Sequence, residues 1–257
     1  MSEALSGGSL LLADEIRVVV ASNFAGAIKE MAAHFEQQSG HKIVLIFGST
    51  GKHYAQIRNG APFDIFFAAD ARRPALLEKE NIAIPASRFT YAIGKLVLWS
   101  PDRKLIDAKG NVLKNTTFRY LAIANPKLAP YGMAAQEVLE RRKLWENLQG
   151  KMVRGENIGQ AFQFVKTGNA ELGFIAYSQI KHPDTNTLME GSFWLVPQTL
   201  YTPIEQQAVL LKDNPVARDF LAFVKSTEAL KLIGNMGYSI PPLEKTNDEE
   251  ITAKEHN

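Results

Sequence analysis

Two apolar runs near the start of the chain end in small polar residues, and a helical pattern follows each of them directly. The first run covers residues 18–21 and ends at Ser22 and Asn23, and the second covers residues 43–47 and leads into Ser49. A buried strand that feeds a helix has this pattern, with a polar residue at the helix N-cap. Because the first N–H groups of a helix have no acceptor within the helix, two such turns side by side predict a binding site for an anion.

The same alternation continues along the chain and indicates the fold class. A third apolar run at residues 63–68 is followed by Asp70 and another helical pattern. Strands that alternate with helices are typical of an α/β protein, with a parallel sheet and helices on its faces. Such sheets bind ligands beyond the carboxyl ends of their strands, where Ser22, Asn23 and Ser49 are expected.

The middle of the chain repeats the strand–helix alternation as a second unit. Two long crossings, near residues 91–97 and 198–206, join the two units. We therefore expect two α/β lobes connected by a double hinge, which allows closure around a ligand. The predicted division is a leader or signal remnant at residues 1–13, a first lobe at 14–92 and 203–244, a second lobe at 93–202 and a flexible tail at 245–257.

Composition excludes several classes of site. The 257 residues carry a formal net charge of +2, too near neutral to indicate a nucleic-acid or membrane-surface partner. The chain has no cysteine, which excludes disulfides, zinc–thiolate sites and cysteine nucleophiles. The five histidines lack the spacing of metal ligands, and we expect solvated surface positions for them, at residues 34, 41, 53, 182 and 256.

The known catalytic motifs do not fit this chain either, so we predict that the protein is not an enzyme. Residues 48–51 read Gly-Ser-Thr-Gly and lack the Gly-x-Ser-x-Gly spacing of a nucleophile elbow. Ile46 stands where the first glycine of a phosphate-binding P-loop belongs. Asp64 and Asp70 fit a strand start and a helix cap better than a catalytic carboxylate pair.

Two further helix starts follow in the second unit. Tyr131 follows Pro130, and Ile158 follows Asn157. Each has a purely structural alternative, since proline is common at the first helical position and asparagine at the N-cap. Tyr177 lies at the end of an apolar run, where a tyrosine is more often a packed aromatic than a ligand contact.

The segments around these turns carry a family resemblance. They read Ala-Ser-Asn-Phe at residues 21–24 and Phe-Gly-Ser-Thr-Gly at 47–51, and Gln-Ile-x-x-Gly-Ala-Pro-x-Asp at 56–64 is the most specific run. In these segments the chain resembles the periplasmic molybdate-binding proteins of ABC importers, the ModA family. The resemblance covers about residues 15–240 in collinear order. Further matching segments are residues 125–126, 130–132, 155–158 and 171–174.

The resemblance implies a class II solute-binding fold, with two lobes, a double-strand hinge and one tetrahedral oxyanion in the cleft. The oxyanion-binding residues that it implies are Ser22, Asn23, Ser49, Tyr131 and Ile158, with Tyr177 as a sixth candidate. Some members use a tyrosine hydroxyl at a position that aligns with Ala176 here. Tyr177 is one residue later, and neighbouring residues of a strand face opposite sides of the sheet.

The function implied is capture of molybdate, and of tungstate, between the lobes and delivery to the membrane permease of an ABC transporter. The resemblance also implies a periplasmic location, a monomer, no nucleic-acid partner and no cofactor apart from the bound oxyanion. An alternative is a binding protein for another tetrahedral oxyanion, such as sulfate. A ferric site would need clustered tyrosines and carboxylates, a transcription regulator would need an N-terminal helix-turn-helix, and a hydrolase using Ser49 would need a paired histidine.

Overall fold

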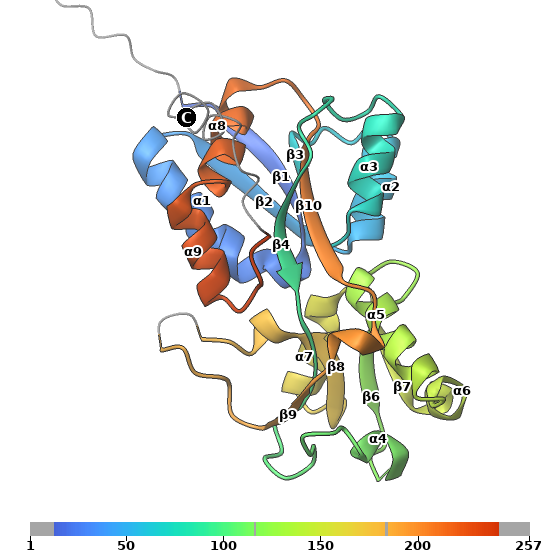
Figure 1. Ribbon diagram of the computed structural model, residues 1–257. Coiled ribbons are helices and arrows are strands. Elements are labelled where there is room, and N and C mark those ends of the chain that lie inside the picture. The colour runs from blue at the N-terminus through green and yellow to red at the C-terminus, as the bar shows by residue number, and fades with distance from the viewer. Residues whose placement is uncertain (1–12, 116, 183–184, 242–257) are drawn as a thin grey trace, which may run out of the picture.

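The computed structural model describes residues 13–115, 117–182 and 185–241, and it contains two five-stranded mixed sheets with helices around each (Figure 1). This arrangement confirms the predicted α/β class. The predicted tail at residues 245–257 and the predicted leader, apart from Ala13, lie outside the described residues. Within the described ranges, no helix is long and apolar enough to cross a membrane.

The first sheet has helices on both faces. Its strand order is β2 (Lys42–Gly48), β1 (Glu15–Ala21), β3 (Ile65–Ala68), β10 (Ile204–Leu210) and β4 (Phe89–Gly94). The first three strands are parallel to one another, and β10 runs antiparallel to both β3 and β4. One side carries α1 (Ala25–Ser39), α8 (Pro215–Val224) and α9 (Thr227–Asn235), and the other carries α2 (Thr50–Arg58) and α3 (Arg72–Lys79) (Figure 1).

The second sheet has the same layered form. Its strand order is β7 (Met152–Gly155), β6 (Leu121–Ala124), β8 (Leu172–Ala176), β5 (Leu96–Ser100) and β9 (Ser192–Leu195). The helices of this half are α4 (Val112–Asn115), α5 (Pro130–Arg141), α6 (Trp145–Leu148) and α7 (Ile158–Lys166). Short 3-10 helices complete the chain: η1 (Ser22–Phe24), η2 (Gln149–Lys151), η3 (Tyr177–Gln179) and η4 (Gln198–Leu200).

The chain passes between the halves twice, at the places where the sequence predicts crossings. Only Lys95 separates β4 of the first sheet from β5 of the second, and residues 196–203 lead back from β9 to β10. Strand β10 has an irregularity in its pairing with β4 between Gln206 and Gln207. The limits of the two lobes as separate domains stay a prediction.

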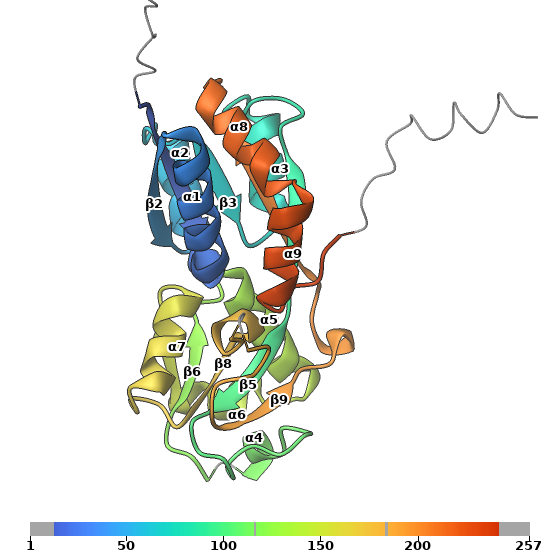
Figure 2. The same ribbon diagram turned by 90° about the vertical axis from the view of Figure 1, so that its left-hand side faces the viewer.

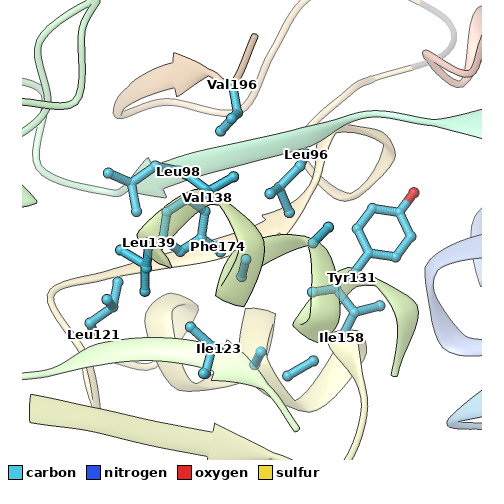
Figure 3. Packing of buried hydrophobic residues seen from close by; sticks show 14 of the residues in the cluster. Leu96, Leu98, Leu121, Ile123, Tyr131, Val138, Leu139, Ile158, Phe174 and Val196 are labelled. Carbon is cyan, nitrogen blue, oxygen red and sulfur yellow. The ribbon is translucent and has the colours of Figure 1, made fainter. Parts of the chain in front are cut away.

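The hydrophobic core of the second half reaches the first half where the two meet. Leu98, Ile123 and Phe174 form its interior, and Ala21 and Ala69 of the first half belong to the same cluster. Figure 3 shows the side of this core on which Tyr131 and Ile158 lie, with the Tyr131 hydroxyl directed away from the other labelled side chains. The starts of α5 and α7 are therefore held by core packing against the carboxyl ends of the first sheet (Figure 2).

Candidate functional site

A small pocket lies between the two halves, at the carboxyl ends of strands from both sheets. It has about 180 Å³ of empty space, including its mouth. The centre of a water-sized sphere has only about 10 Å³ of space inside it, so the closed pocket suits a small ion and not a drug-sized organic ligand. The residues that line it are Ala21, Ser22, Asn23, Gly48, Ser49, Thr50, Ala69, Ala129, Pro130, Tyr131, Asn157 and Ile158.

The first half contributes two adjacent strand-to-helix turns. Strands β1 and β2 pair in parallel with Ala21 opposite Gly48, so the turns after them lie side by side. Ser22 and Asn23 form the start of η1, and Ser49 is the N-cap of α2. The Ser49 hydroxyl oxygen accepts from the Lys52 N–H at 3.4 Å, which leaves its own O–H proton free to donate.

The second half contributes the first turns of two helices. Helix α5 begins at Pro130 after Ala129, which has no side chain that can cap it. Helix α7 begins at Ile158 after Asn157, whose side-chain oxygen accepts from the Gln160 N–H at 3.0 Å. The N–H groups of Tyr131 and Ile158 belong to these first turns, where a helix offers them no acceptor. Both residues line the pocket.

Hydrogen bonds between the halves close the pocket. The Ser22 hydroxyl accepts from the Gly159 N–H at 3.1 Å. The Gly51 N–H donates to the Leu128 carbonyl at 2.8 Å, so the start of α2 is tied to the loop before α5. The Ser178 hydroxyl donates to the Asn23 carbonyl at 3.3 Å. These contacts exist only when the two halves are close together, so the structure is that of a closed state.

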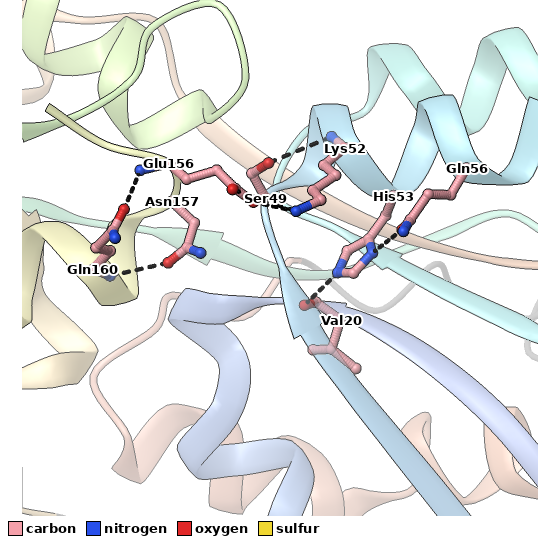
Figure 4. A network of polar contacts seen from close by, with 8 residues as sticks. All are labelled: Val20, Ser49, Lys52, His53, Gln56, Glu156, Asn157 and Gln160. Carbon is pink, nitrogen blue, oxygen red and sulfur yellow. Dashed lines mark hydrogen bonds and ion pairs between the residues drawn. The ribbon is translucent and has the colours of Figure 1, made fainter.

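No side chain with a formal charge lines the described pocket. Lys52 is not among the lining residues, and its ammonium pairs with Glu156 of the second half at 3.0 Å (Figure 4). The pocket therefore offers dipoles and hydrogen-bond donors instead of cationic head groups. The starts of α2, α5 and α7 all line it, and helix N-termini favour anions.

His53 corrects one sequence prediction. The sequence predicts a solvated surface position for it, but it is 2 % exposed and its ring lies against Gly48, a residue that lines the pocket. A β-carbon at Gly48 would come within 2.8 Å of the imidazole, so glycine makes the room that the ring fills. Its Nε2 lies 3.3 Å from the Val20 carbonyl and its Nδ1 lies 3.3 Å from Gln56 Oε1 (Figure 4). Burial lowers the pKa of His53, which keeps the ring neutral.

Tyr177 is the one sequence candidate that does not line the pocket. Strand β8 ends at Ala176, and the chain turns at once into η3. The Tyr177 ring packs instead on Gly237, where an added β-carbon would lie 2.7 Å from the ring. The other five candidates, Ser22, Asn23, Ser49, Tyr131 and Ile158, all line the one pocket.

The sequence analysis does not identify the residues that form hydrogen bonds with the Asn23 side chain. The Asn23 amide nitrogen donates to Gln206 Oε1 at 2.7 Å and to the Tyr238 hydroxyl at 3.2 Å. The Tyr238 hydroxyl in turn donates to the Asn23 carbonyl at 2.7 Å. These partners are 183 and 215 residues away in the chain, so no local pattern marks them.

Comparison with known proteins agrees with this geometry. The family model for bacterial extracellular solute-binding proteins matches residues 16–239. The molybdate-binding protein ModA of Azotobacter vinelandii is 49% identical over 243 residues, which cover 92% of this chain and 96% of that protein. ModA of Rhodobacter capsulatus is 48% identical over 229 residues and 88% of each chain.

A solved structure gives the same result in three dimensions. The periplasmic molybdate-binding protein of Azotobacter vinelandii superposes with a TM-score of 0.85 at 42% identity, over 88% of this chain and 99% of that one. The class II fold and the family resemblance that the sequence predicts are confirmed. This chain belongs to the bacterial extracellular solute-binding proteins and, within them, to the ModA family.

Proposed function

We propose that this protein captures molybdate, and tungstate with similar affinity, in the pocket between its halves and delivers it to the membrane permease of an ABC transporter. The observation that carries the proposal is a pocket lined by the starts of three helices and, among the described residues, by no charged side chain. The relatives named above are binding proteins for transport, and the same role here is non-enzymatic, extracytoplasmic and carried out by a monomer.

The donor set suits a fully ionised tetrahedral oxyanion. Molybdate near neutral pH has four equivalent oxygens, two negative charges and no proton, so every group around it has to donate. The N–H groups of Tyr131 and Ile158 and the Ser49 hydroxyl are such donors. Each helix N-terminus adds about 0.3–1 kcal/mol when exposed and up to about 2 kcal/mol when partly buried.

The same set discriminates against other oxyanions for two different reasons. Hydrogen phosphate carries a proton that needs an acceptor, and a buried donor left without one costs about 1–3 kcal/mol. Sulfate has the charge of molybdate and no proton, so its rejection has to come from its shorter bonds and smaller size. Tungstate has nearly the size of molybdate and is expected to bind equally well.

Closure gives the ligand its effect on the permease. Helices α2 and α5 belong to different halves, so an ion held by both is bound fully only in the closed state. A ligand shifts a conformational equilibrium by the difference between its affinities for the two states. The closed shape is then the signal that the permease reads.

The test is calorimetric titration, together with a thermal-shift panel of molybdate, tungstate, sulfate, phosphate and chromate. We expect molybdate and tungstate to raise the melting temperature most, because both bind the folded state alone. A larger shift with sulfate would contradict the proposal and make the protein a sulfate binder.

A serine pair tests the site itself. Ser49→Ala removes a hydroxyl from the pocket and is expected to weaken molybdate binding by about tenfold or more. Ser226 is the matched control, because it too is a helix N-cap, accepting from the Ala229 N–H at 3.2 Å, but caps α9 away from the pocket. Ser226→Ala should cost stability and leave the affinity unchanged. Equal affinities for the two variants would remove Ser49 from the site.

A further inference from the structure

The two halves meet at a pair of glycines, each of which is the second residue of a helix that lines the pocket. Gly51 lies in α2 of the first half, and its N–H donates to the Leu128 carbonyl of the second half at 2.8 Å. Gly159 lies in α7 of the second half, and its N–H donates to the Ser22 hydroxyl of the first half at 3.1 Å. We call these two pairs the closure contacts. Each half contributes one glycine and one acceptor to them.

The closure contacts are as close as such groups normally come. A β-carbon at Gly51 would lie 2.9 Å from the Leu128 carbonyl oxygen and 3.1 Å from the Leu128 Cα atom. A β-carbon at Gly159 would lie 3.2 Å from the Ser22 β-carbon and 3.4 Å from its hydroxyl oxygen. Carbon atoms in contact are normally about 3.5–4.0 Å apart, and N–H···O bonds are rarely shorter than about 2.7 Å. The halves therefore close to this separation because neither glycine has a side chain, and they cannot close further here.

Other contacts between the halves can follow a change in their separation. Lys52 and Glu156 pair through two long side chains that are each about half exposed (Figure 4). The closure contacts, in contrast, join backbone atoms to backbone atoms or to a side chain one bond from the backbone. Packed backbone of this kind has low compressibility. The closure contacts therefore set the smallest distance between the two halves.

The same distance sets the width of the pocket, because the closure contacts adjoin it. Ser22 lines the pocket, and so do the chain neighbours of the other three residues, namely Thr50, Ala129 and Ile158. An ion in the pocket has to span the gap between donors of the first half, such as Ser49, and donors of the second half, such as Ile158. A smaller ion held by one set of donors lies too far from the other set.

We propose that Gly51 and Gly159 are specificity-determining residues, which let the halves close to the separation that fits molybdate and prevent the closer approach that sulfate would need. The inference rests on the proposed function, in which sulfate differs from molybdate by its size. Specificity is a difference between two affinities. A fixed smallest separation lowers the affinity for the smaller ion, because the full set of donors does not reach it, and leaves the affinity for the larger ion intact.

Alanine at position 51 tests the inference, because it adds one methyl group to a closure contact. Gly51→Ala has to hold the halves farther apart, by a few tenths of an ångström, so the affinity for molybdate should fall by about tenfold. The fall should be steeper for chromate and steepest for sulfate, since widely spaced donors lose a small ion first. Calorimetric titration measures this series, with competition against molybdate where an ion binds weakly.

The other closure contact provides a second variant. Gly159→Ala adds a methyl group against Ser22, and the Asn157 side-chain oxygen, 3.1 Å from the added carbon, has to move as well. The affinities of this variant should fall in the same order of ion size. Because the two glycines belong to different helices and different halves, a shared order would come from the separation of the halves and not from one damaged turn.

The stability of the free protein distinguishes a closure contact from a disturbed fold. Neither Gly51 nor Gly159 has a positive φ, and alanine is a better helix former than glycine. The added methyl group meets the other half only in the closed state, so the melting temperature of free Gly51→Ala should equal or exceed that of the wild type. Gly234→Ala is the matched control in α9, where the nearest atom to the added carbon is 3.9 Å away. It should leave the affinity for every ion unchanged.

The outcomes are distinct for the two proposals. The wild type is titrated first with the five oxyanions. A preference for sulfate contradicts the proposed ligand, and the order of the losses in the alanine variants still tests the closure contacts, whereas no binding of any ion overturns both proposals. Wild-type affinities in Gly51→Ala and Gly159→Ala, equal losses for ions of all sizes, or a lowered melting temperature of both free variants overturns the role of the two glycines.

Discussion

The pocket and the group of buried polar side chains behind it are built from different kinds of polar group. We call the second group the hinge cluster, and its members are Asn23, Tyr91, Tyr131, Gln206 and Tyr238. The pocket uses helix starts and short side chains, such as Ser22 and Ser49, which follow strands within a few residues of sequence. The hinge cluster uses long side chains that meet across more than a hundred residues of chain, as Gln206 meets Asn23 and Tyr91. Backbone donors are fixed by the fold, so the first region is suited to holding an ion, whereas the second joins strands β4 and β10 to the start of η1.

The largest expected effect comes from moving the backbone of the pocket wall. A β-carbon at Gly132 would lie 2.3 Å from the Ala124 carbonyl oxygen, so Gly132→Ala has to push the start of α5 off β6. We expect it to cost about 1–3 kcal/mol of unfolding free energy and to abolish tight oxyanion binding. Gly150→Ala is the control, because nothing lies within 4 Å of the added carbon. Wild-type affinity in Gly132→Ala would show that the α5 start is not part of the site.

The hinge cluster should respond less, and differently for stability and binding. Tyr131→Phe removes a buried hydroxyl that lies beside Gln206 Nε2 and can accept from it, so it should cost the free protein about 1 kcal/mol of unfolding free energy. Because the N–H of Tyr131, and not its hydroxyl, is the expected donor to the ion, molybdate affinity should change less than about threefold by calorimetry. An unchanged stability together with a large loss of affinity would contradict this expectation.

The two regions should also differ in their response to pH. The lowered pKa of His53, caused by burial, means that the unfolded chain binds a proton more readily than the folded protein. Stability from this group is complete above the unfolded value of 6.5 and is lost as the pH falls below it. Denaturant melts of wild type and His53→Gln from neutral to acid pH should diverge, the variant losing less stability. If the unfolding free energies of the two proteins fall in parallel as the pH is lowered, His53 does not contribute to the loss of stability in acid.

The hinge cluster should lose stability in alkali instead. Burial raises the pKa of Tyr238 to about 12. Its contribution to stability is complete below the ordinary value of 10.0 and is lost as the pH rises from there to the raised value. In Tyr238→Phe, alkaline unfolding should be less steep, as measured by circular dichroism against pH. An unchanged slope would contradict this assignment.

The smallest effect is expected from an exposed ion pair that joins the two halves. Lys52 and Glu156 pair across the halves, but both are about half exposed, and such pairs contribute only about 0.2–1 kcal/mol. Glu156→Lys should therefore speed ligand release by about two- to fivefold, and combining it with Lys52→Glu should restore the wild-type rate. Stopped-flow measurement of the ligand release rate at low and high salt tests this pair. An effect on the rate that salt does not reduce would contradict an electrostatic contribution of the Lys52–Glu156 pair to closure.

The same contrast explains how much the sequence could predict. Ser22, Asn23 and Ser49 were found because an apolar run, a polar cap and a helical pattern are contiguous signals. Tyr131 and Ile158 were found from helix starts and from the family resemblance. The first crossing follows from its long apolar run, and the second from the strand expected at residues 205–211.

The remaining features depend on contacts that no local pattern contains. Gln206 was recognised only as part of a returning strand, because its partners are far away in the sequence. His53 was placed at the surface because nothing in its own segment shows that Gly48 leaves room for a buried ring. Tyr177 became a candidate because the ligand tyrosine of some family members aligns with the preceding residue, Ala176. Strand β8 ends at Ala176, and the Tyr177 ring lies outside the pocket lining and packs on Gly237.

The central claim is that uncharged donors from both halves enclose a doubly negative tetrahedral ion. A crystal structure of the protein grown with molybdate, with the metal located by its anomalous scattering, tests this most directly. The account predicts one ion between the starts of α2, α5 and α7, with its oxygens accepting from Ser49, Tyr131 and Ile158. An ion bound elsewhere, or one held by a lysine or arginine head group, would contradict it.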